Sequence, residues 1–340
     1  MRKLFNTLYV TTPDAYLSKD GLNVVVSVKQ KELFRIPIVN IESVVIFGYM
    51  GVSPGLMKLC VDYNVALIFL SPNGKFIGRL KCSIKGNVLL RTRQWSLAKD
   101  EQFTLSISKL FISGKIQNYR NILSRFLRDN GSNDDVKETI LHLKLCKEKV
   151  LNSTDLDYLR GVEGEAANRY FGILPQLILQ QKEDFVFTGR NRRPPKDAVN
   201  IMLSFAYTLI ASDITSALET IGLDPYVGFL HTLRSGRPAL SLDMMEEFRA
   251  YLGDRFVLSL INRKQLSIKN FIQHGDNSVV ISDEGRKIIL TAWQNRKKET
   301  IIHPYLGDKV PIGLLPYVQA MLFARYLRGE LDNYPVFLIN

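Results

Sequence analysis

The chain has 340 residues, of which 46% are hydrophobic and 10% aromatic, so it can bury a core and is not a disordered protein. At about 150 residues per domain, this length predicts two domains. The formal charge of +12 favours a polyanionic partner such as nucleic acid. The alternative is a basic protein without a specialised partner.

The start of the chain and its cysteines favour a cytoplasmic protein. Residues 1–6 lack the apolar region of a secretory signal peptide. Uncharged apolar runs fall short of the roughly 18 residues of a membrane span, so we expect no membrane partner. Cys60, Cys82 and Cys146 are odd in number and lack CxxC spacing, which is typical of reduced thiols and not of a zinc site or disulfide framework.

Residues 1–86 predict an N-terminal β-rich, sandwich-like domain. Short β-branched and aromatic runs are separated by turns and lie at residues 22–28, 33–39, 43–47 and 65–70. A helix interrupts them, with Ser53 as its N-cap and Pro54 as its first residue. Residues 1–97 contain 13 Lys and Arg against 5 Asp and Glu, a net charge of +8. We interpret this region as a basic, mostly antiparallel domain for dimerisation and partner contacts.

Residues 87–340 predict a larger α-helical catalytic domain, which makes the fold class α+β. Apolar residues at helical spacing predict helices over residues 97–127 and 134–151, the second capped by Asp134 or Asp135. Further helices are expected around Glu163 and from Asp197 to about Ile221. A hairpin is expected near residues 268–281.

The segment Gly189–Lys196 joins two predicted helices and is stiffened by two prolines. Its cationic residues Arg190, Arg192, Arg193 and Lys196 suit a phosphate clamp. A solvated linker is the alternative interpretation.

Glu163 and His231 are candidate site residues that precede the acidic helix at residues 242–249. On a helix, Glu163 shares a face with Ala166 and Ala167, whose small side chains let another segment approach. His231 follows an apolar run and precedes a loop bounded by glycine and proline. An ordinary helix acid and a structural hydrogen-bonding histidine are the alternatives.

Asp243, Glu246 and Glu247 are spaced to lie on or near one helix face. Acids in such a row usually face solvent, but these interrupt an apolar pattern. Glu163, His231 and Glu246 together have the composition of a divalent-metal site. Carboxylates with one imidazole suit Mg²⁺ or Mn²⁺, which serve phosphoryl transfer. A basic chain with an acidic metal pocket is typical of an enzyme that acts on nucleic acid.

Four motifs in chain order resemble a known family, the CRISPR-associated integrase/endonuclease of spacer acquisition (the Cas-one family). The motifs lie at residues 161–171, 195–200, 228–231 and 242–249. The first contains Gly-x-Glu-Gly, and the last reads Leu-Asp-x-x-Glu-x-Phe-Arg. The resemblance extends over essentially the whole chain. The length and residues 329–335 are similar to the subtype I-C branch.

The resemblance implies a homodimer, and a small ferredoxin-like partner would bridge two such dimers into a heterohexamer. That assembly would capture a double-stranded DNA fragment and insert it into a CRISPR repeat by metal-dependent transesterification, a step in antiviral defence. Mg²⁺ or Mn²⁺ would be the cofactor and the prokaryotic cytoplasm the location.

The resemblance also implies roles for individual residues. The family's metal ligands fall on Glu163, His231 and Glu246, where many members have Asp in the third place. Asp243 lies where the family often carries another acid, and we group it with the catalytic residues. Glu165 and Glu247 are expected as surface charges. The expected DNA contacts beyond the cationic loop are Asn200, Gln319, Arg325 and Arg328.

Two other functions stay open. A structure-specific nuclease acting on branched DNA in repair would use the same metal site with water as the nucleophile. A DNA-binding scaffold without catalysis would bind DNA independently of metal. His142, His274 and His303 lack acidic neighbours at ligand spacing in the sequence, so we expect them to bind no metal.

Overall fold

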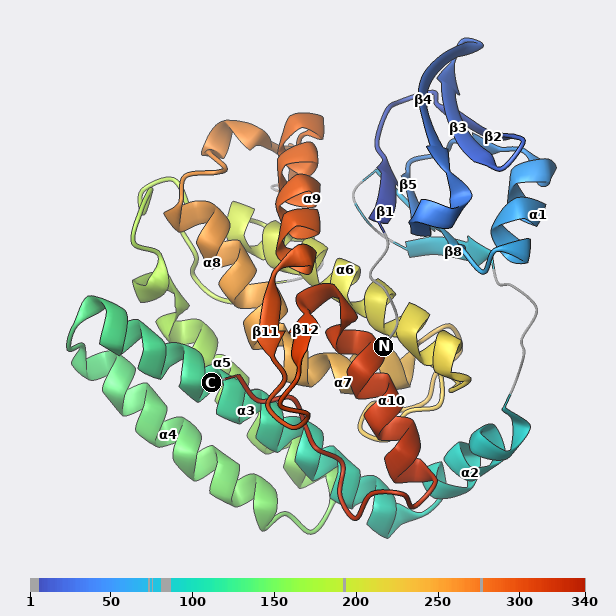
Figure 1. Ribbon diagram of the computed structural model, residues 1–340. Helices are drawn as coiled ribbons and strands as arrows, with labels where there is room; N and C mark the ends of the chain where they lie inside the picture. The colour runs from blue at the N-terminus through green and yellow to red at the C-terminus, as the bar shows by residue number, and fades with distance from the viewer. Residues whose placement is uncertain are drawn as a thin grey trace. The chain divides into compact units, whose positions relative to one another are not determined.

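A computed structural model describes residues 6–72, 74, 76–80, 87–191, 194–275 and 278–339 (Figure 1). The chain forms two compact units. The first contains Met1–Lys85, Ser282–Ile301 and Pro311–Leu314, and the second contains Gly86–Ile281, Ile302–Val310 and Leu315–Asn340. A β-rich first region is followed by helices, which confirms the predicted fold class.

The strands of the first unit form one sheet in the order β1-β5-β7-β8 and a second in the order β4-β3-β2-β6. The first consists of β1 (Asn6–Val10), β5 (Ile41–Phe47), β7 (Ala66–Leu70) and β8 (Phe76–Leu80). The second consists of β4 (Lys31–Pro37), β3 (Asn23–Val28), β2 (Tyr16–Asp20) and β6 (Gly51–Val52). The 3-10 turn η1 (Ile38–Asn40) leads from β4 into β5.

The expectation of a mostly antiparallel domain is wrong for the first sheet, because β1 pairs parallel with β5 and β5 pairs parallel with β7. Parallel neighbours need a long crossover connection. β2, β3 and β4 of the second sheet lie in the first crossover, and β6 and α1 (Pro54–Asp62) lie in the second. Ser53 caps α1 as predicted, since its Oγ accepts a hydrogen bond from Leu56 N at 3.2 Å.

Both sheets and α1 contribute to one apolar core. Leu17 and Val24 from the second sheet, Val44 and Leu67 from the first, and Leu56 from α1 are completely buried in it. Each such side chain adds roughly 1.5–3 kcal/mol of stabilisation on burial. This shared core gives the two sheets a sandwich-like packing.

The helix α9 (Asp283–Lys298) belongs to the first unit, although the predicted domain division placed every residue after 86 in the helical domain. Gln294 Nε2 donates to the carbonyl of Thr7 in β1 at 2.6 Å. The Arg286 guanidinium lies over the Phe47 ring, 5.7 Å from its centroid. The first contact joins residues 287 positions apart, and the second joins Arg286 to Phe47, 239 positions earlier (286 − 47), so local sequence patterns do not reveal either.

The second unit is mainly helical. Its helices are α2 (Val88–Ala98), α3 (Glu101–Asn130), α4 (Asp134–Leu151), α5 (Leu156–Ile173), α6 (Ala198–Ile221), α7 (Ala239–Phe248), α8 (Arg255–Asn262) and α10 (Leu315–Leu327). Figure 1 shows α3 and α4 side by side. The short elements of the later chain are η2 (Leu174–Leu177), the π-helical turn η3 (Arg249–Asp254), η4 (Ile268–Asn270), β9 (Phe271–Gln273), β10 (Val279–Ile281), β11 (Thr300–Ile302), β12 (Lys309–Pro311) and η5 (Ile312–Leu314).

Several helix boundaries follow from local chemistry. Asp197 caps α6 as predicted, because its Oδ1 accepts a hydrogen bond from Asn200 N at 2.7 Å. The hairpin predicted near residues 268–281 is formed by β9 and β10. The predicted cap of α4 is wrong: Asn133 Oδ1 accepts from Val136 N at 3.1 Å, and Asp134 lies in the first turn.

The helix α6 is long and apolar enough to cross a membrane by length and composition alone. Most of its apolar residues are buried against the rest of the second unit. Core helices of folded domains meet the same criterion, so this feature is weak evidence for a membrane span. Asp213 and Glu219 interrupt its apolar run.

Candidate metal site

Two helices of the second unit present carboxylates to one buried ammonium. Lys115 Nζ of α3 forms ion pairs with Glu163 Oε1 of α5 and, at 2.7 Å, with Glu246 Oε2 of α7. The side chains of Lys115 and Glu246 are only 5% and 4% exposed, whereas that of Glu163 is 29% exposed. The structure therefore gathers two predicted ligands around a position that attracts positive charge. Sequence reasoning missed Lys115, because it lies 48 positions before Glu163.

His231 is held by the buried carboxylate of Asp243. His231 Nδ1 lies 2.6 Å from Asp243 Oδ1, which also accepts from His231 N at 3.0 Å. The other oxygen, Oδ2, accepts from Phe229 N at 2.6 Å and from Leu230 N at 3.0 Å. Nε2 of the ring consequently faces the site, 4.0 Å from Glu246 Oε1.

Close packing explains why this loop begins with glycine. A Cβ on Gly228 would lie 2.6 Å from the carbonyl carbon of Ala239 and 2.7 Å from Asp243 Oδ2. Any larger residue would therefore push the loop away from α7. Arg160 of α5 fixes the other side of the loop, since its Nη2 donates to the carbonyl of Leu230 at 2.8 Å.

Electrostatics keep the buried carboxylate of Glu246 ionised. Its burial would raise its pKa, but the positive charges of Arg249 and Lys115 lower the pKa to about 2. Burial would lower the pKa of Lys115, yet Glu246 and Glu163 raise it above its usual value. Arg249 Nε lies 2.9 Å from Glu246 Oε2, and its guanidinium lies over the Tyr207 ring at 4.7 Å. Glu246, Lys115 and Arg249 are therefore all charged at neutral pH.

A π-helical turn follows the ligand-bearing helix. In η3, a Cβ on Gly253 would lie 2.6 Å from Tyr207 Cε1, so glycine allows the turn to approach α6. The Tyr207 hydroxyl donates to Asp254 Oδ1 at 2.5 Å. Such turns occur frequently at functional sites. Here the turn holds Arg249 between Glu246 and the Tyr207 ring.

The expectation that Glu247 is a surface charge is wrong, because its side chain is fully buried. Its Oε1 accepts from the Tyr334 hydroxyl at 2.6 Å. Its Oε2 accepts from Phe337 N at 2.6 Å and from Gln319 Nε2 at 3.0 Å. Glu247 therefore anchors the C-terminal segment beside the metal-site helix. The partners lie more than 70 positions away, beyond the reach of helical periodicity.

Two of the residues expected to contact DNA are buried in the protein. Asn200 and Gln319 are fully buried, so neither offers a surface to DNA. Asn200 braces the loop before α6: its Oδ1 accepts from Arg190 Nη1 at 2.7 Å, and its Nδ2 donates to the carbonyl of Gly189 at 2.8 Å. Gln319 lies 3.1 Å from His303 Nε2 and contacts the C-terminal segment.

The remaining expected DNA contacts differ in exposure. Arg190 is half-buried and also donates to Ser204 Oγ at 3.1 Å, so it supports the loop from within. Lys196 is exposed, and the 43% exposed side chain of Arg325 pairs with Glu330 at 3.1 Å. The exposed guanidinium of Arg328 binds Glu330 as well. Arg192 and Arg193 lie outside the described residues.

The donor set fits a hard divalent cation. Glu163 and Glu246 offer carboxylate oxygens, and His231 offers Nε2 while Asp243 occupies the opposite nitrogen. Ligand histidines are commonly oriented in this way by a carboxylate behind them. The bridging ammonium shows that the two carboxylates accept a shared cation. The helical unit therefore links Glu163, Lys115, Glu246 and His231 in one chain of charged contacts.

The family follows from comparison with known proteins. Residues 8–295 match the family described as CRISPR associated protein Cas1. The chain is 46% identical to CRISPR-associated endonuclease Cas1 1 of Chlorobaculum tepidum over 99% of both chains. It is also 46% identical to Cas1 2 of Rhodospirillum rubrum over 98% of both. The chain belongs to the Cas1 family of CRISPR-associated proteins.

Solved structures share the fold. A Cas1 protein from Thermotoga maritima has a TM-score of 0.82 at 21% identity, over 98% of this chain and 100% of that one. A casposase bound to an integration product has a TM-score of 0.84 at 21% identity, over 99% and 96%. A chain of a Cas6-RT-Cas1–Cas2 complex has a TM-score of 0.84 at 22% identity, over 99% of this chain and 36% of that one.

Proposed function

We propose that this protein is a metal-dependent DNA integrase and endonuclease that inserts captured foreign DNA fragments as new spacers into a CRISPR repeat array. The observation that carries this proposal is the chain of ion pairs in which Lys115 joins Glu163 to Glu246, with His231 Nε2 4.0 Å from Glu246 Oε1. Membership of the Cas1 family, with relatives named as endonucleases, supports the same activity.

Mg²⁺ or Mn²⁺ would be held by Glu163, His231 and Glu246, and when bound it supplies charge stabilisation at a phosphodiester. The protein's own residues prepare that position. Asp243 orients the His231 ring through Nδ1, and Arg249 fixes the Glu246 carboxylate through Oε2. In transesterification, a DNA 3′-hydroxyl replaces the leaving oxygen at phosphorus, so the number of phosphodiester bonds is conserved.

The substrate is double-stranded DNA, both as the captured fragment and as the CRISPR repeat. A net charge of +12 supports binding of this polyanion. Lys196, Arg325 and Arg328 are the exposed cationic candidates for phosphate contact among the expected residues that the structure describes. The similar casposase is bound to an integration product, which supports DNA strand transfer as the reaction.

The proposed assembly is a homodimer, with two dimers bridged by a small ferredoxin-like partner into a heterohexamer. The similarity to a chain of a Cas6-RT-Cas1–Cas2 complex supports a Cas2-type partner. The length and residues 329–335 support assignment to the subtype I-C branch, and the prokaryotic cytoplasm is the proposed location.

A half-site integration assay tests the metal site. The assay combines a repeat-containing plasmid, labelled DNA fragment, Cas2-type partner and Mn²⁺. Glu163→Ala and His231→Ala should abolish joining, whereas Glu148→Ala, an exposed acid of α4, should retain it. Glu246→Asp should retain more activity than Glu246→Ala because a ligand oxygen survives. Full joining by Glu163→Ala and His231→Ala would overturn the proposal.

Product analysis distinguishes the remaining functions. Joined strands indicate integration, while cut strands without joining indicate a nuclease that uses water. Metal-independent DNA binding with no joining or cutting in the wild type would indicate a scaffold.

A further inference from the structure

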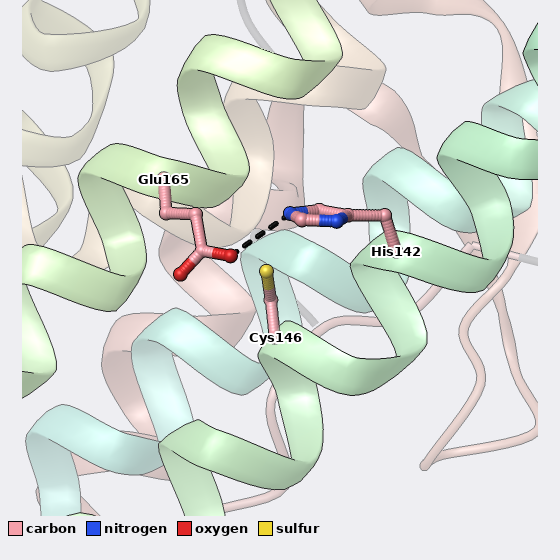
Figure 2. A group of neighbouring side chains, drawn as sticks. All are labelled: His142, Cys146 and Glu165. Carbon is pink, nitrogen blue, oxygen red and sulfur yellow. Dashed lines mark ion pairs between the residues drawn. The ribbon is translucent and has the colours of Figure 1, made fainter.

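A second group of metal-ligating side chains lies where α4 packs on α5 (Figure 2). His142 and Cys146 are one turn apart on α4, and Glu165 projects toward them from α5. One ligand atom from each residue lies within 4.8 Å of the other two. His142 was expected to lack an acidic neighbour, but Glu165 Oε1 lies 2.9 Å from its Nε2. The acid comes from another helix, so sequence spacing did not reveal it.

This group is separate from the candidate metal site of Glu163, His231 and Glu246. Glu165 follows Glu163 by two residues, which turns its side chain by about 200° around α5. Glu163 binds Lys115 of α3, whereas Glu165 binds residues of α4. A ligand held by Glu165 would therefore leave the Glu163 carboxylate available.

The chemistry of the group differs as well. It combines a thiol sulfur, an imidazole nitrogen and a carboxylate oxygen, all of which are zinc ligands. Sulfur and nitrogen donors favour Zn²⁺ or Co²⁺, whereas Mg²⁺ and Mn²⁺ prefer oxygen. We propose that His142, Cys146 and Glu165 form a Zn²⁺ site that fastens α4 to α5, with solvent completing the coordination.

The burial and the charges of the three side chains suit a bound Zn²⁺ ion. Cys146 is fully buried, which shields the sulfur, while the side chains of His142 and Glu165 are 36% and 37% exposed and leave a path for the ion. On binding, the Cys146 thiol releases its proton to solvent. The resulting thiolate and the Glu165 carboxylate balance the two positive charges of the metal.

The ammonium group of Lys149 pairs with the Glu165 carboxylate, so this carboxylate already binds a cation. Its Nζ lies 3.1 Å and 3.0 Å from the two oxygens of Glu165. The Lys149 side chain is 45% exposed, so it can turn into solvent when a metal takes the carboxylate. The cost of that change is small because exposed ion pairs contribute little to stability.

Cobalt substitution tests the site without using DNA activity. Co²⁺ is titrated into the metal-stripped full chain, and thiolate coordination is read as a near-ultraviolet charge-transfer band together with visible bands of a tetrahedral ion. The wild type should show these bands at one equivalent, and Zn²⁺ should abolish them by displacement. Absence of the bands in the wild type would overturn the proposal.

Variants assign the ligands. Cys146→Ala should lose the charge-transfer band. His142→Asn, a change at a half-exposed position, should weaken Co²⁺ binding more than about tenfold. Tenfold is roughly the smallest loss seen when a residue that only hydrogen-bonds a metal ligand is removed. Cys60→Ala and the double variant Glu163→Gln/His231→Asn are matched controls and should keep the band. A band that persists in Cys146→Ala, or full Co²⁺ affinity in His142→Asn, would overturn the proposed ligands. Because these readouts are independent of strand joining, their failure is distinguishable from failure of the proposed function.

Discussion

His231 and Asp243 form a pair in which the carboxylate orients the imidazole. Asp243 Oδ1 lies 2.6 Å from His231 Nδ1, so Nε2 is directed toward Glu246. The same fully buried carboxylate accepts backbone N–H groups of the loop that carries the histidine. The geometry therefore indicates a positioning role for Asp243, which the sequence analysis grouped with the catalytic residues.

Replacing Asp243 with Asn should disturb this orientation while preserving side-chain size. The amide NH₂ cannot accept the hydrogen bonds that one carboxylate oxygen now receives. We expect strand joining to fall about 10- to 100-fold and the Mn²⁺ requirement to rise. The measurement is an Mn²⁺ titration of half-site integration, with circular dichroism as a folding check. An unchanged Mn²⁺ requirement in a folded variant would contradict the positioning role.

Replacing Lys115 with Met should destabilise the protein more in the absence of a divalent metal than in its presence. The change leaves Glu163 and Glu246 without their shared ammonium, and breaking a buried ion pair costs about 3–5 kcal/mol. A bound divalent ion would supply the missing charge, so thermal unfolding in Mn²⁺ should recover most of the loss seen in EDTA. Lys137→Met, which breaks an exposed pair with Asp134, is the control and should cost at most about 1 kcal/mol. Equal destabilisation of Lys115→Met in Mn²⁺ and EDTA would argue against a shared cation position.

Local structure was predictable where neighbouring residues determine it. Ser53 and Asp197 cap their helices because side chain and backbone donor lie three positions apart. Lys115 and the burial of Glu247 escaped prediction because their partners lie far along the chain. Glu163, His231 and Glu246 were grouped through family resemblance, since spacing alone left each with an ordinary structural explanation.

The pairing of Tyr334 with Glu247 should contribute measurably to stability. Tyr334→Phe removes one of the donors to Glu247. At pH 8, above the raised pKa of about 7, Glu247 is ionised, and a hydrogen bond to a charged group contributes about 1.5–3 kcal/mol. The free energy of unfolding from urea denaturation should fall by this amount. Tyr305→Phe, at a position that is 52% exposed, should change it by less than about 0.5 kcal/mol. If both variants had the same midpoint as wild type, the C-terminal anchor would be energetically unimportant.

The buried carboxyl of Asp254 should make stability depend on pH. Burial raises its pKa from 3.8 to about 6, against the opposing hydrogen bond from Tyr207. Because the folded pKa exceeds the unfolded one, this contribution is fully present below about pH 4 and is lost as pH rises through about 6. Asp254→Asn stays neutral and keeps an oxygen that accepts from Tyr207.

The comparison of wild type and Asp254→Asn isolates this contribution. Glu247, whose pKa burial raises to about 7, remains in both proteins and affects both curves alike. Between pH 4 and pH 7.5 the wild type should lose about 3 kcal/mol of unfolding free energy relative to the variant, as a pKa difference of about two units implies. Urea denaturation at half-unit pH steps measures the two curves. Parallel curves across that range would show that Asp254 ionises in the folded protein as readily as in the unfolded chain, and its burial beside Tyr207 would then carry no pH-dependent cost.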